Sequence, residues 1–426
     1  MSKPSNRSAL SLIEKLNKIC GDENVITDND SILSKGFQEV LQVQVVVTPG
    51  SAEEIKNIVL LALESDWKLL PVGGGTQLRQ VLTPGKGGIG LCLNRLDKVL
   101  EFEPDNLCII VEAGVTSDTI SKLVAEKNLQ LPIFSDTPRS TIGGKTASNF
   151  SSWKRYRYGS MEDYVLGLTF VTPTGKIVKT GGKTVKNVSG YDFTKLLGGS
   201  WGTMGILYSI ILKLLPRPEK EILLTRSFDS LTKGLHVGAK ILENKSKISS
   251  CNLFCHQNGS ASDKFTMLVS FDGSNDFVAS ELKGFDRDNT FHQVKSEAVA
   301  EIKKSYADLR KRLKSTFFNT VVYGRKAFPD AAEALEFIHL QGCVFDMDLA
   351  AGILEFSALE PVKGQKGQFW QEWERIRGKY PDHASKFTSE NYGQPLLDRL
   401  LPVIDPKQVM FRNNVFIGRP DHGKRI

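Results

Sequence analysis

The sequence predicts an α+β protein with at least two domains, and three observations support this. Its 426 residues exceed the size of one ordinary hydrophobic core. A strand, a helix and a second strand are indicated from Val43 onward, and short β-rich stretches separated by turn residues follow. After Pro216 and Pro218, strands and helices alternate without any glycine-rich loop, so these two prolines mark the expected domain boundary.

The N-terminal residues predict a short amphipathic helix that is capped by Ser8 and ends near Gly21. This pattern differs from that of a secretory signal. No apolar run approaches the length of about 18 residues that a membrane-spanning helix needs. We therefore expect no transmembrane segment, and a location in the cytoplasm or, through partner proteins, at the face of the inner membrane.

The first predicted unit is strand, helix, strand. Residues 43–47 form an apolar run, Ser51 and Glu54 make a capping box for a helix to about Ser65, and residues 68–72 supply the second strand. Two strands joined in this way are expected to be parallel. The loop after the second strand then lies at the carboxyl edge of the sheet, where ligands usually bind.

Several further elements follow from periodicity and turn chemistry. The sequence predicts a helix over residues 117–126, a hairpin over 165–182 with its turn at Thr174 and Gly175, and a long strand after Gly205. Beyond residue 220 it predicts a strand over 264–271 and a helix over 296–313.

Composition describes a folded and modestly basic chain. Hydrophobic residues make up 40% and charged residues 24%, and 55 Lys and Arg against 48 Asp and Glu leave a formal charge of +7. That excess helps to collect an anionic cofactor or substrate. It is too small to indicate nucleic acid. The basic and aromatic run at 154–158 is compatible with a single-strand binding groove, but a loop beside a phosphate-bearing cofactor explains it equally well.

The six cysteines predict neither disulfides nor a metal site, because a chain of this size needs no disulfide to be stable. Cys251 and Cys255 are adjacent to His256, but structural zinc takes four ligands and no matching second pair is present. We expect reduced thiols and ordinary strand side chains at these positions.

Three glycine-rich segments within one predicted domain are the candidate binding residues. The first is Gly73, Gly74, Gly75 and Thr76, the second spans 135–149, and the third spans 198–206. Glycines let a backbone approach a pyrophosphate closely, and hydroxyl side chains add hydrogen-bond donors. Each segment alone is also compatible with an ordinary turn or surface loop, and their order and spacing within one domain favour a shared ligand.

Five sequence blocks resemble a known family. They are PVGGGTQL at 71–78, TIGG at 141–144, RYGSMEDYVLGL at 157–168, KNVSGYDFTKLLGGSWGTMGI at 186–206 and KLLPRP at 213–218. They resemble the FAD-binding, PCMH-type domain of the vanillyl-alcohol oxidase flavoproteins, and within that family the FAD-binding subunit of glycolate oxidase. The resemblance implies four segments: an N-terminal helical segment (1–35), the FAD-binding domain of two subdomains (36–218), an α+β cap or substrate domain (219–400) and a C-terminal segment that returns to the FAD domain (401–426).

The resemblance also implies a cofactor and its site. Some relatives attach FAD covalently through a His where this chain has Gly75, so we expect noncovalent FAD. Ser151 and Ser152 replace a glycine that relatives commonly have after the Asn, which makes the shape of that loop less predictable. The cofactor-binding residues implied are Gly73, Gly74, Gly75, Thr76, Gln77, Thr137, Thr141, Gly143, Gly144, Ala147, Asn149, Gly202, Gly205 and Ile206.

The histidines supply no catalytic motif. Related 2-hydroxy-acid dehydrogenases carry H-x-x-G-D-x-N-x-H in the cap, and the sequence around His256 does not match it. The other five histidines stand alone, so no general base is assigned. Lys154, Arg155 and Arg157 are compatible with binding a substrate carboxylate, although a solvated basic face is the preferred interpretation.

Three functions remain open at this point. The first is a redox subunit that oxidises a 2-hydroxy acid such as glycolate and passes electrons toward a partner, with a homologous flavoprotein subunit and an iron-sulfur subunit as expected partners. The second is a noncatalytic FAD-binding subunit of such a complex. The third is a stand-alone oxidase of an alcohol or sugar lactone. The substrate, the electron acceptor and the oligomeric state do not follow from the sequence.

Overall fold

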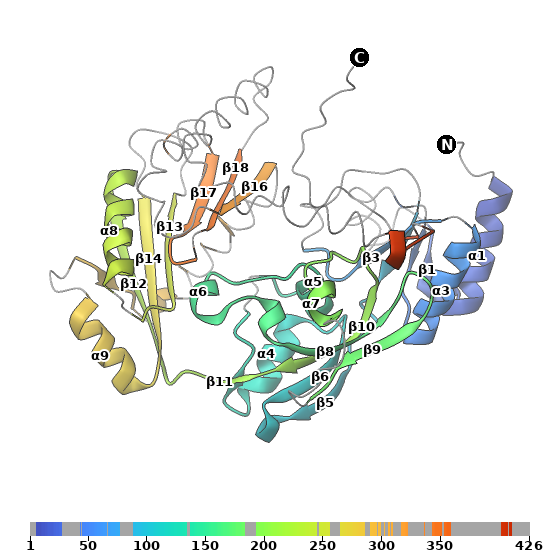
Figure 1. The fold of residues 1–426 in the computed structure, drawn as a ribbon, viewed down its shortest axis with the longest axis horizontal. Coiled ribbons are helices and arrows are strands. Elements are labelled where there is room, and N and C mark those ends of the chain that lie inside the picture. Colours follow the sequence, from blue (N-terminus) through green and yellow to red (C-terminus); the bar gives the residue numbers. More distant parts are fainter. Residues whose placement is uncertain are drawn as a thin grey trace, which may run out of the picture. The chain divides into compact units, whose positions relative to one another are not determined.

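The computed structural model divides into two compact units. Unit 1 comprises Met1–Ser152, Ser160–Arg217 and Pro395–Ile426, and unit 2 comprises Trp153–Gly159 and Pro218–Gln394. Within these ranges the structure describes residues 6–27, 43, 45–65, 67–76, 88–133, 137–183, 193–244, 247–255, 265–285, 290–295, 297–299, 302, 306, 308–309, 317–322, 336, 343–351, 353–358, 402–407 and 409–410. The elements of both units are labelled in Figure 1.

The first sheet of unit 1 has the strand order β1-β2-β4-β3. Its strands are β1 (Val25–Ile26), β2 (Val45–Val47), β4 (Ile89–Cys92) and β3 (Leu69–Val72). Strands β2 and β3 both run parallel to β4, which lies between them. The predicted parallel arrangement is confirmed, and the position of β4 is new information from the structure.

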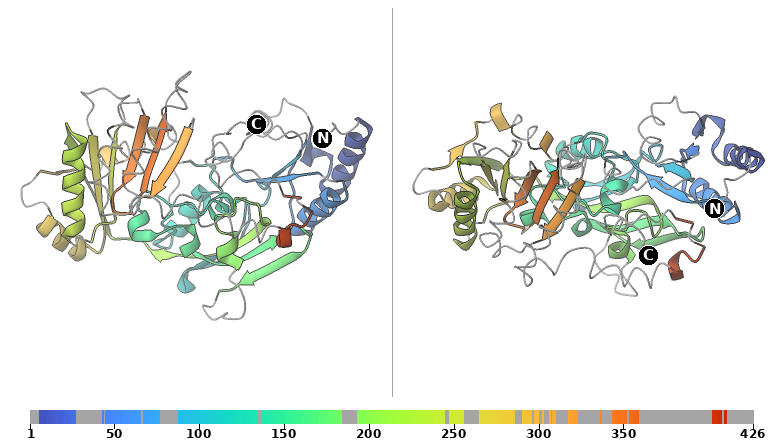
Figure 2. Two further views of the ribbon diagram at one scale, coloured as in Figure 1. Left: turned by 45° about the horizontal axis from the view of Figure 1, so that its top comes forward. Right: turned by 90° about the horizontal axis from the view of Figure 1, so that it is seen from above.

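Two helices accompany this sheet, α1 (Asn6–Cys20) and α3 (Ala52–Ser65). They lie side by side in all three ribbon views, in Figures 1 and 2. One half of the predicted capping box of α3 is present, because the Glu54 amide donates to Ser51 Oγ at 3.1 Å. The Glu54 carboxylate accepts from the Gly50 amide at 2.9 Å instead of from the Ser51 amide. The predicted cap of α1 is wrong: the helix begins two residues before Ser8, since a serine near a helix start is not obliged to cap it.

The second sheet of unit 1 is antiparallel, with the order β5-β6-β10-β8-β9. Its strands are β5 (Val99–Glu103), β6 (Cys108–Glu112), β10 (Ile206–Lys213), β8 (Val165–Val171) and β9 (Ile177–Gly181). The predicted hairpin is β8 paired with β9, and Gly175 at its turn has φ 77°. That positive φ explains the glycine, because other residues are strained in this region.

Shorter elements complete unit 1. They are the 3₁₀ turns η1 (Asp22–Asn24), η3 (Pro104–Asn106) and η4 (Met161–Asp163), the helices α4 (Ser117–Ala125), α5 (Ile142–Ala147) and α7 (Phe193–Leu197), and the strand pair β7 (Leu129–Gln130) and β11 (Leu215–Pro216). A single apolar core joins both sheets. Near the C-terminus, Met410 forms a parallel bridge with Leu69, and the Asp405 carboxylate accepts the amides of Val409 and Met410.

Unit 2 is built on a seven-stranded antiparallel sheet of order β15-β12-β14-β13-β17-β18-β16. Its elements are α6 (Arg155–Tyr158), β12 (Lys220–Phe228), α8 (Leu231–Glu243), β13 (Ser250–Cys255), β14 (Phe265–Gly273), α9 (Asn275–Phe285), β15 (His292–Gln293), β16 (Phe317–Val322), β17 (Cys343–Asp348) and β18 (Ile353–Ala358). Helices α8 and α9 both lie beside the strands β12 and β14, and α8 also contacts β13 (Figure 1). The described residues of the predicted helix 296–313 are helical.

Successive side chains along each strand point to opposite faces of the unit 2 sheet, and these two faces differ in composition. Cys251, Leu253 and Cys255 belong to an apolar cluster with residues of α8 and α9, whereas Ser250 and Asn252 point to the opposite face and are also fully buried. The prediction that Cys251 and Cys255 are strand side chains is confirmed. Both are free thiols, and no metal-binding cluster of His, Cys, Asp or Glu occurs among the described residues.

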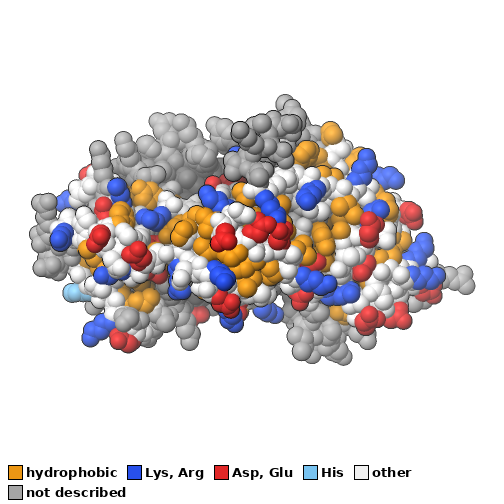
Figure 3. Space-filling view, turned by 90° about the horizontal axis from the view of Figure 1, so that it is seen from below, with side chains coloured by type: hydrophobic (Ala, Val, Ile, Leu, Met, Phe, Trp, Pro, Cys, Tyr) orange, Lys and Arg blue, Asp and Glu red, His pale blue; other side chains and the backbone are white. Residues whose placement is uncertain are grey.

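Surface charge is mixed on the face drawn in Figure 3, where acidic and basic side chains are interspersed among apolar ones. That face therefore carries no extended field of one sign. Among the residues that can be described, none of the helices has the length and apolar character that crossing a membrane requires.

Candidate cofactor site

The three glycine-rich segments meet in unit 1. The first segment follows directly after β3, the second ends in α5, and the third leads into β10. The first and second segments are in direct backbone contact. A Cβ on Gly73 would lie 2.2 Å from Thr141 Oγ1, and a Cβ on Gly74 would lie 1.7 Å from the carbonyl oxygen of Arg139. Only glycine fits at either position.

The third segment joins the second through backbone hydrogen bonds. The Gly199 amide donates to the Thr146 carbonyl at 3.3 Å, and the Trp201 amide donates to the Ala147 carbonyl at 2.8 Å. It also approaches β3, because a Cβ on Gly202 would lie 3.1 Å from Pro71 Cγ. All three segments thus converge on one region, as expected for a shared ligand.

The second segment is partly helical rather than a loop, which corrects the interpretation from sequence. Thr141 caps α5, since its Oγ1 accepts from the Gly144 amide at 3.2 Å. Gly143 is buried, and its amide donates to the Ala113 carbonyl at 2.8 Å. The sequence did not predict helix α5, because glycine-rich sequences have low helix propensity. A capping threonine and tertiary packing override that propensity here.

The remaining candidate residues have the following positions. Asn149 has φ 46° and its Oδ1 accepts from the Glu162 amide at 3.1 Å, which orders the end of the second segment. Thr137 is exposed, Gly205 has φ 156°, and the buried Ile206 begins β10. Gln77 and the block KNVSGYD at 186–192 lie outside the described residues.

Sequence reasoning missed two residues of this region. Ala113 packs closely against Gly143, because a Cβ on Gly143 would lie 2.8 Å from the Cβ of Ala113. The sequence signal for this contact was the pair of adjacent small residues Ala113 and Gly114. Lys145 is 1% exposed, and its Nζ donates to the Ile133 carbonyl and lies 5.3 Å from the centre of the Phe150 ring. No sequence pattern indicated that this lysine is buried.

Four described cysteines are poor nucleophiles. Burial raises the pKa of Cys20 to about 12 and also raises the pKa of Cys92, Cys108 and Cys251 above the ordinary thiol value. These thiols stay protonated at neutral pH, and thiolate chemistry is not expected from them.

Lys154 lies in a buried ion cluster of unit 2, which corrects the expectation of a solvated basic face. Its side chain is 3% exposed, and Nζ lies 2.9 Å from Glu221 Oε1 and 3.1 Å from Asp272 Oδ2. The Tyr158 hydroxyl also donates to Asp272 Oδ2, at 2.5 Å. The pKa of Asp272 is below its ordinary value: burial opposes ionisation, but the ammonium of Lys154 and hydrogen bonds from Ser249 and Tyr158 outweigh it.

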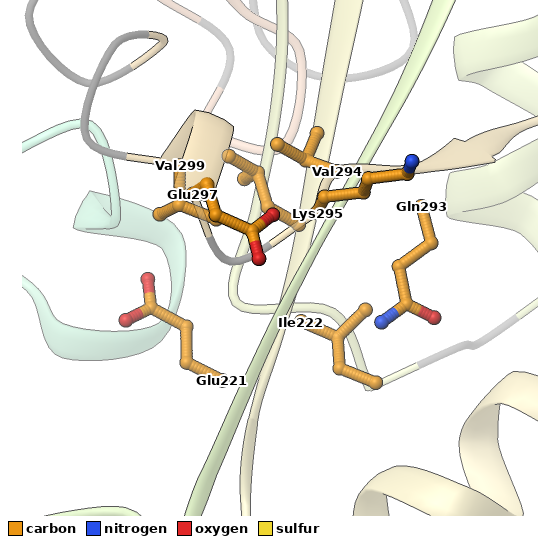
Figure 4. Close-up of a pocket in the computed structure, with 8 residues that line it drawn as sticks. Glu221, Ile222, Gln293, Val294, Lys295, Glu297 and Val299 are labelled. Carbon is orange, nitrogen blue, oxygen red and sulfur yellow. The ribbon is translucent and has the colours of Figure 1, made fainter.

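A cavity of about 650 Å³ lies at the edge of β12, where the chain leaves β15. Figure 4 shows the Glu221 carboxylate and the Lys295 ammonium on opposite sides of it. The lining residues are Glu221, Ile222, Leu223, Gln293, Val294, Lys295, Glu297 and Val299. All of them belong to unit 2, and none belongs to the glycine-rich segments.

Comparison with known proteins agrees with this geometry. Residues 43–181 match the model of the FAD binding domain. The chain is 32% identical to a glycolate oxidase subunit of Bacillus subtilis over 237 residues, which cover 54% of this chain and 50% of that protein. It is 31% identical to a D-lactate dehydrogenase of Anaerostipes hadrus, over 53% of this chain and 48% of that protein. The matched part therefore spans about half the length of these relatives.

The fold comparison extends over most of the chain. A p-cresol methylhydroxylase structure superposes with a TM-score of 0.74 over 95% of this chain and 96% of that chain, at 13% identity. At that identity the likeness concerns the fold alone. The chain thus shares the fold of that structure. Residues 43–181 form an FAD binding domain, and FAD is the cofactor of the chain.

Proposed function

We propose that this chain is an FAD-dependent dehydrogenase subunit that oxidises a 2-hydroxy acid, such as glycolate, and passes the electrons to a partner protein. The observation that carries the proposal is the convergence of the three glycine-rich segments within a matched FAD-binding domain. The names of the two relatives, a glycolate oxidase subunit and a D-lactate dehydrogenase, support the substrate class. FAD, when bound, supplies the two-electron acceptor.

The cofactor-binding role of the individual residues is part of this proposal. Gly73 and Gly74 lack the Cβ atoms that would clash with Thr141 and Arg139, so the first glycine-rich segment can pack against the second. The pyrophosphate is proposed to bind the loop that these segments form. Gly75 and Thr76 continue that loop, and Thr76 adds a hydroxyl donor. Gly143, Gly144 and Asn149 would complete the cradle, and Ile206 would approach the flavin or ribityl part through its backbone.

The partners belong to the proposal as well. We expect a homologous flavoprotein subunit and an iron-sulfur subunit, because one relative is named as a subunit of glycolate oxidase. Isolation of the chain from its source with these two proteins supports this arrangement. Full turnover of the isolated chain with oxygen contradicts it.

The proposed activity is tested by recording the visible spectrum of the purified protein and then adding glycolate, D-lactate and other 2-hydroxy acids without oxygen. We expect flavin absorption at about 450 nm that bleaches with at least one of these acids. Flavin that stays oxidised with every acid contradicts dehydrogenase activity of this chain and favours a noncatalytic FAD-binding subunit.

Noncovalent attachment is a separate prediction. Because Gly75 offers no side chain for a covalent bond, acid precipitation is expected to release the flavin into the supernatant. Yellow colour that stays in the washed precipitate contradicts the prediction and indicates a covalent link at another residue.

A further inference from the structure

The cavity of unit 2 lies where the edge of the sheet opens at β12. Strand β15 pairs with β12 at Leu224 and Thr225, and the Val294 amide donates to the Leu223 carbonyl at 2.8 Å. Toward the start of β12 this edge has no further strand partner among the described residues, and residues 297–299 are already helical. The separation leaves a space of about 650 Å³, which is within the range of about 300–1,000 Å³ of small-molecule sites.

One part of the cavity lining is apolar. Leu223 is 2% exposed and Ile222 is 5% exposed, while Val294 and Val299 are half-buried. Apolar surface that is removed from water stabilises a complex in proportion to its area. The lining therefore favours a ligand that carries a hydrocarbon group.

The polar part of the lining is divided by charge. In Figure 4 the carboxylate of Glu221 lies at the left and that of Glu297 near the centre, whereas the Lys295 ammonium and the Gln293 amide lie at the right. In the part of the chain that the structure describes, the side chains of Gln293, Lys295 and Glu297 make no ion pair or hydrogen bond. A ligand with a cation at one end and an anion at the other complements this arrangement.

Glu221 connects the cavity to the buried ion cluster of Lys154. The Lys154 ammonium is shared between Glu221 Oε1 at 2.9 Å and Asp272 Oδ2 at 3.1 Å. Of these three side chains, Glu221 is the one that lines the cavity, and it is 31% exposed. Together with Glu297 and Lys295 the cluster has three carboxylates against two ammonium groups, a formal charge of −1. This excess favours a ligand that brings a cation to Glu221.

We infer that the cavity at the edge of β12 binds an α-amino acid with an apolar side chain, at a site additional to the one for FAD. Such a molecule combines an ammonium, a carboxylate and a hydrocarbon group, which are the three features that the lining selects. Its ammonium donates to the carboxylates of Glu221 and Glu297. Its carboxylate accepts from Lys295 and Gln293, and its side chain contacts the apolar lining. The site uses residues of unit 2 alone and does not depend on the proposed function.

The ligand class is tested by calorimetry on the full FAD-loaded protein with leucine and two analogues. 4-Methylpentanoate lacks the ammonium of leucine, and 3-methylbutylamine lacks its carboxylate. Leucine should bind about tenfold or more tightly than either analogue, because each analogue loses a hydrogen bond between charged groups. Leucine that binds no more tightly than both analogues overturns the inference, and so does the absence of binding at up to about 10 mM leucine.

Substitutions at the cavity locate the binding site. Lys295→Met should weaken leucine about tenfold and leave 3-methylbutylamine within about twofold, whereas Glu297→Gln should weaken both compounds. Both side chains are exposed, so neither change is expected to unfold the protein. Lys233→Met removes an exposed lysine that pairs with Asp229 in the same unit, and it should leave leucine binding unchanged. Leucine affinity within about twofold of wild type in both cavity variants overturns the inference. Flavin reduction is not measured, so that outcome leaves the proposed function standing.

Discussion

Substituting Gly74 with Ala is expected to reduce FAD affinity on the order of 100-fold. The new Cβ would lie 1.7 Å from the carbonyl oxygen of Arg139 and 2.8 Å from its carbonyl carbon, so one of the two backbone segments must move. Overpacking costs about 1–3 kcal/mol even where side chains can adjust. A backbone contact adjusts less easily, and about 3 kcal/mol corresponds to the expected loss of affinity. The measurement is the dissociation constant of FAD for the flavin-free protein.

Gly182→Ala is the matched control for this prediction. A Cβ at Gly182 meets nothing within 4 Å, although the residue belongs to the same unit. This variant should bind FAD within about twofold of wild type, since surface substitutions usually change free energies by less than about 0.5 kcal/mol. Unchanged affinity of the Gly74→Ala protein would show that the first glycine segment is not part of the cofactor site.

Substituting Lys154 with Met is expected to destabilise unit 2 by about 3 kcal/mol. Breaking a buried ion pair by removing one partner typically costs about 3–5 kcal/mol because the other charge remains buried. Asp272, at 1% side-chain exposure, is the charge left behind, whereas Glu221 is partly exposed and contributes less. The melting temperature measured by calorimetry should fall by roughly 10 °C, given about 2–4 °C per kcal/mol for a domain of this size.

Lys233→Met is the control, because Lys233 pairs with Asp229 on the surface of the same unit, with side-chain exposures of 67% and 76%. Such exposed pairs contribute little, so its melting temperature should stay within about 2 °C of wild type. Equal melting temperatures for the Lys154→Met and wild-type proteins contradict the buried ion cluster.

The effect of the Lys154 substitution should depend on pH in a defined direction. The pKa of Asp272 is lowered in the folded protein, so its ionised form contributes stability above the ordinary carboxylate pKa of about 4. That contribution is lost as pH falls through the lowered pKa. The difference between wild type and Lys154→Met should therefore shrink in acid, and a difference that grows below about pH 4 contradicts the assignment.

The local elements followed from the sequence because their signals are short in range. Ser51 and Glu54 are three residues apart and form the cap that their spacing predicts. Thr174 and Gly175 make a turn for the same reason, since Gly175 alone supplies the positive φ. The cofactor class followed from the resemblance of five sequence blocks to a known family, because each glycine-rich segment alone was also compatible with an ordinary turn.

Long-range packing decided the rest. Lys154 resembles any surface lysine in sequence, and only Asp272, which is 118 residues away, makes its burial stable. The helical part of the second glycine segment depends on Ala113, and the buried cluster of Asn252, Tyr306 and Asp346 joins residues up to 94 positions apart. The sequence by itself predicted the fold class through local patterns, and it predicted the FAD cofactor through a resemblance of five sequence blocks to a known family. Only the tertiary structure decided which polar side chains are buried together, because that depends on which distant strands become neighbours.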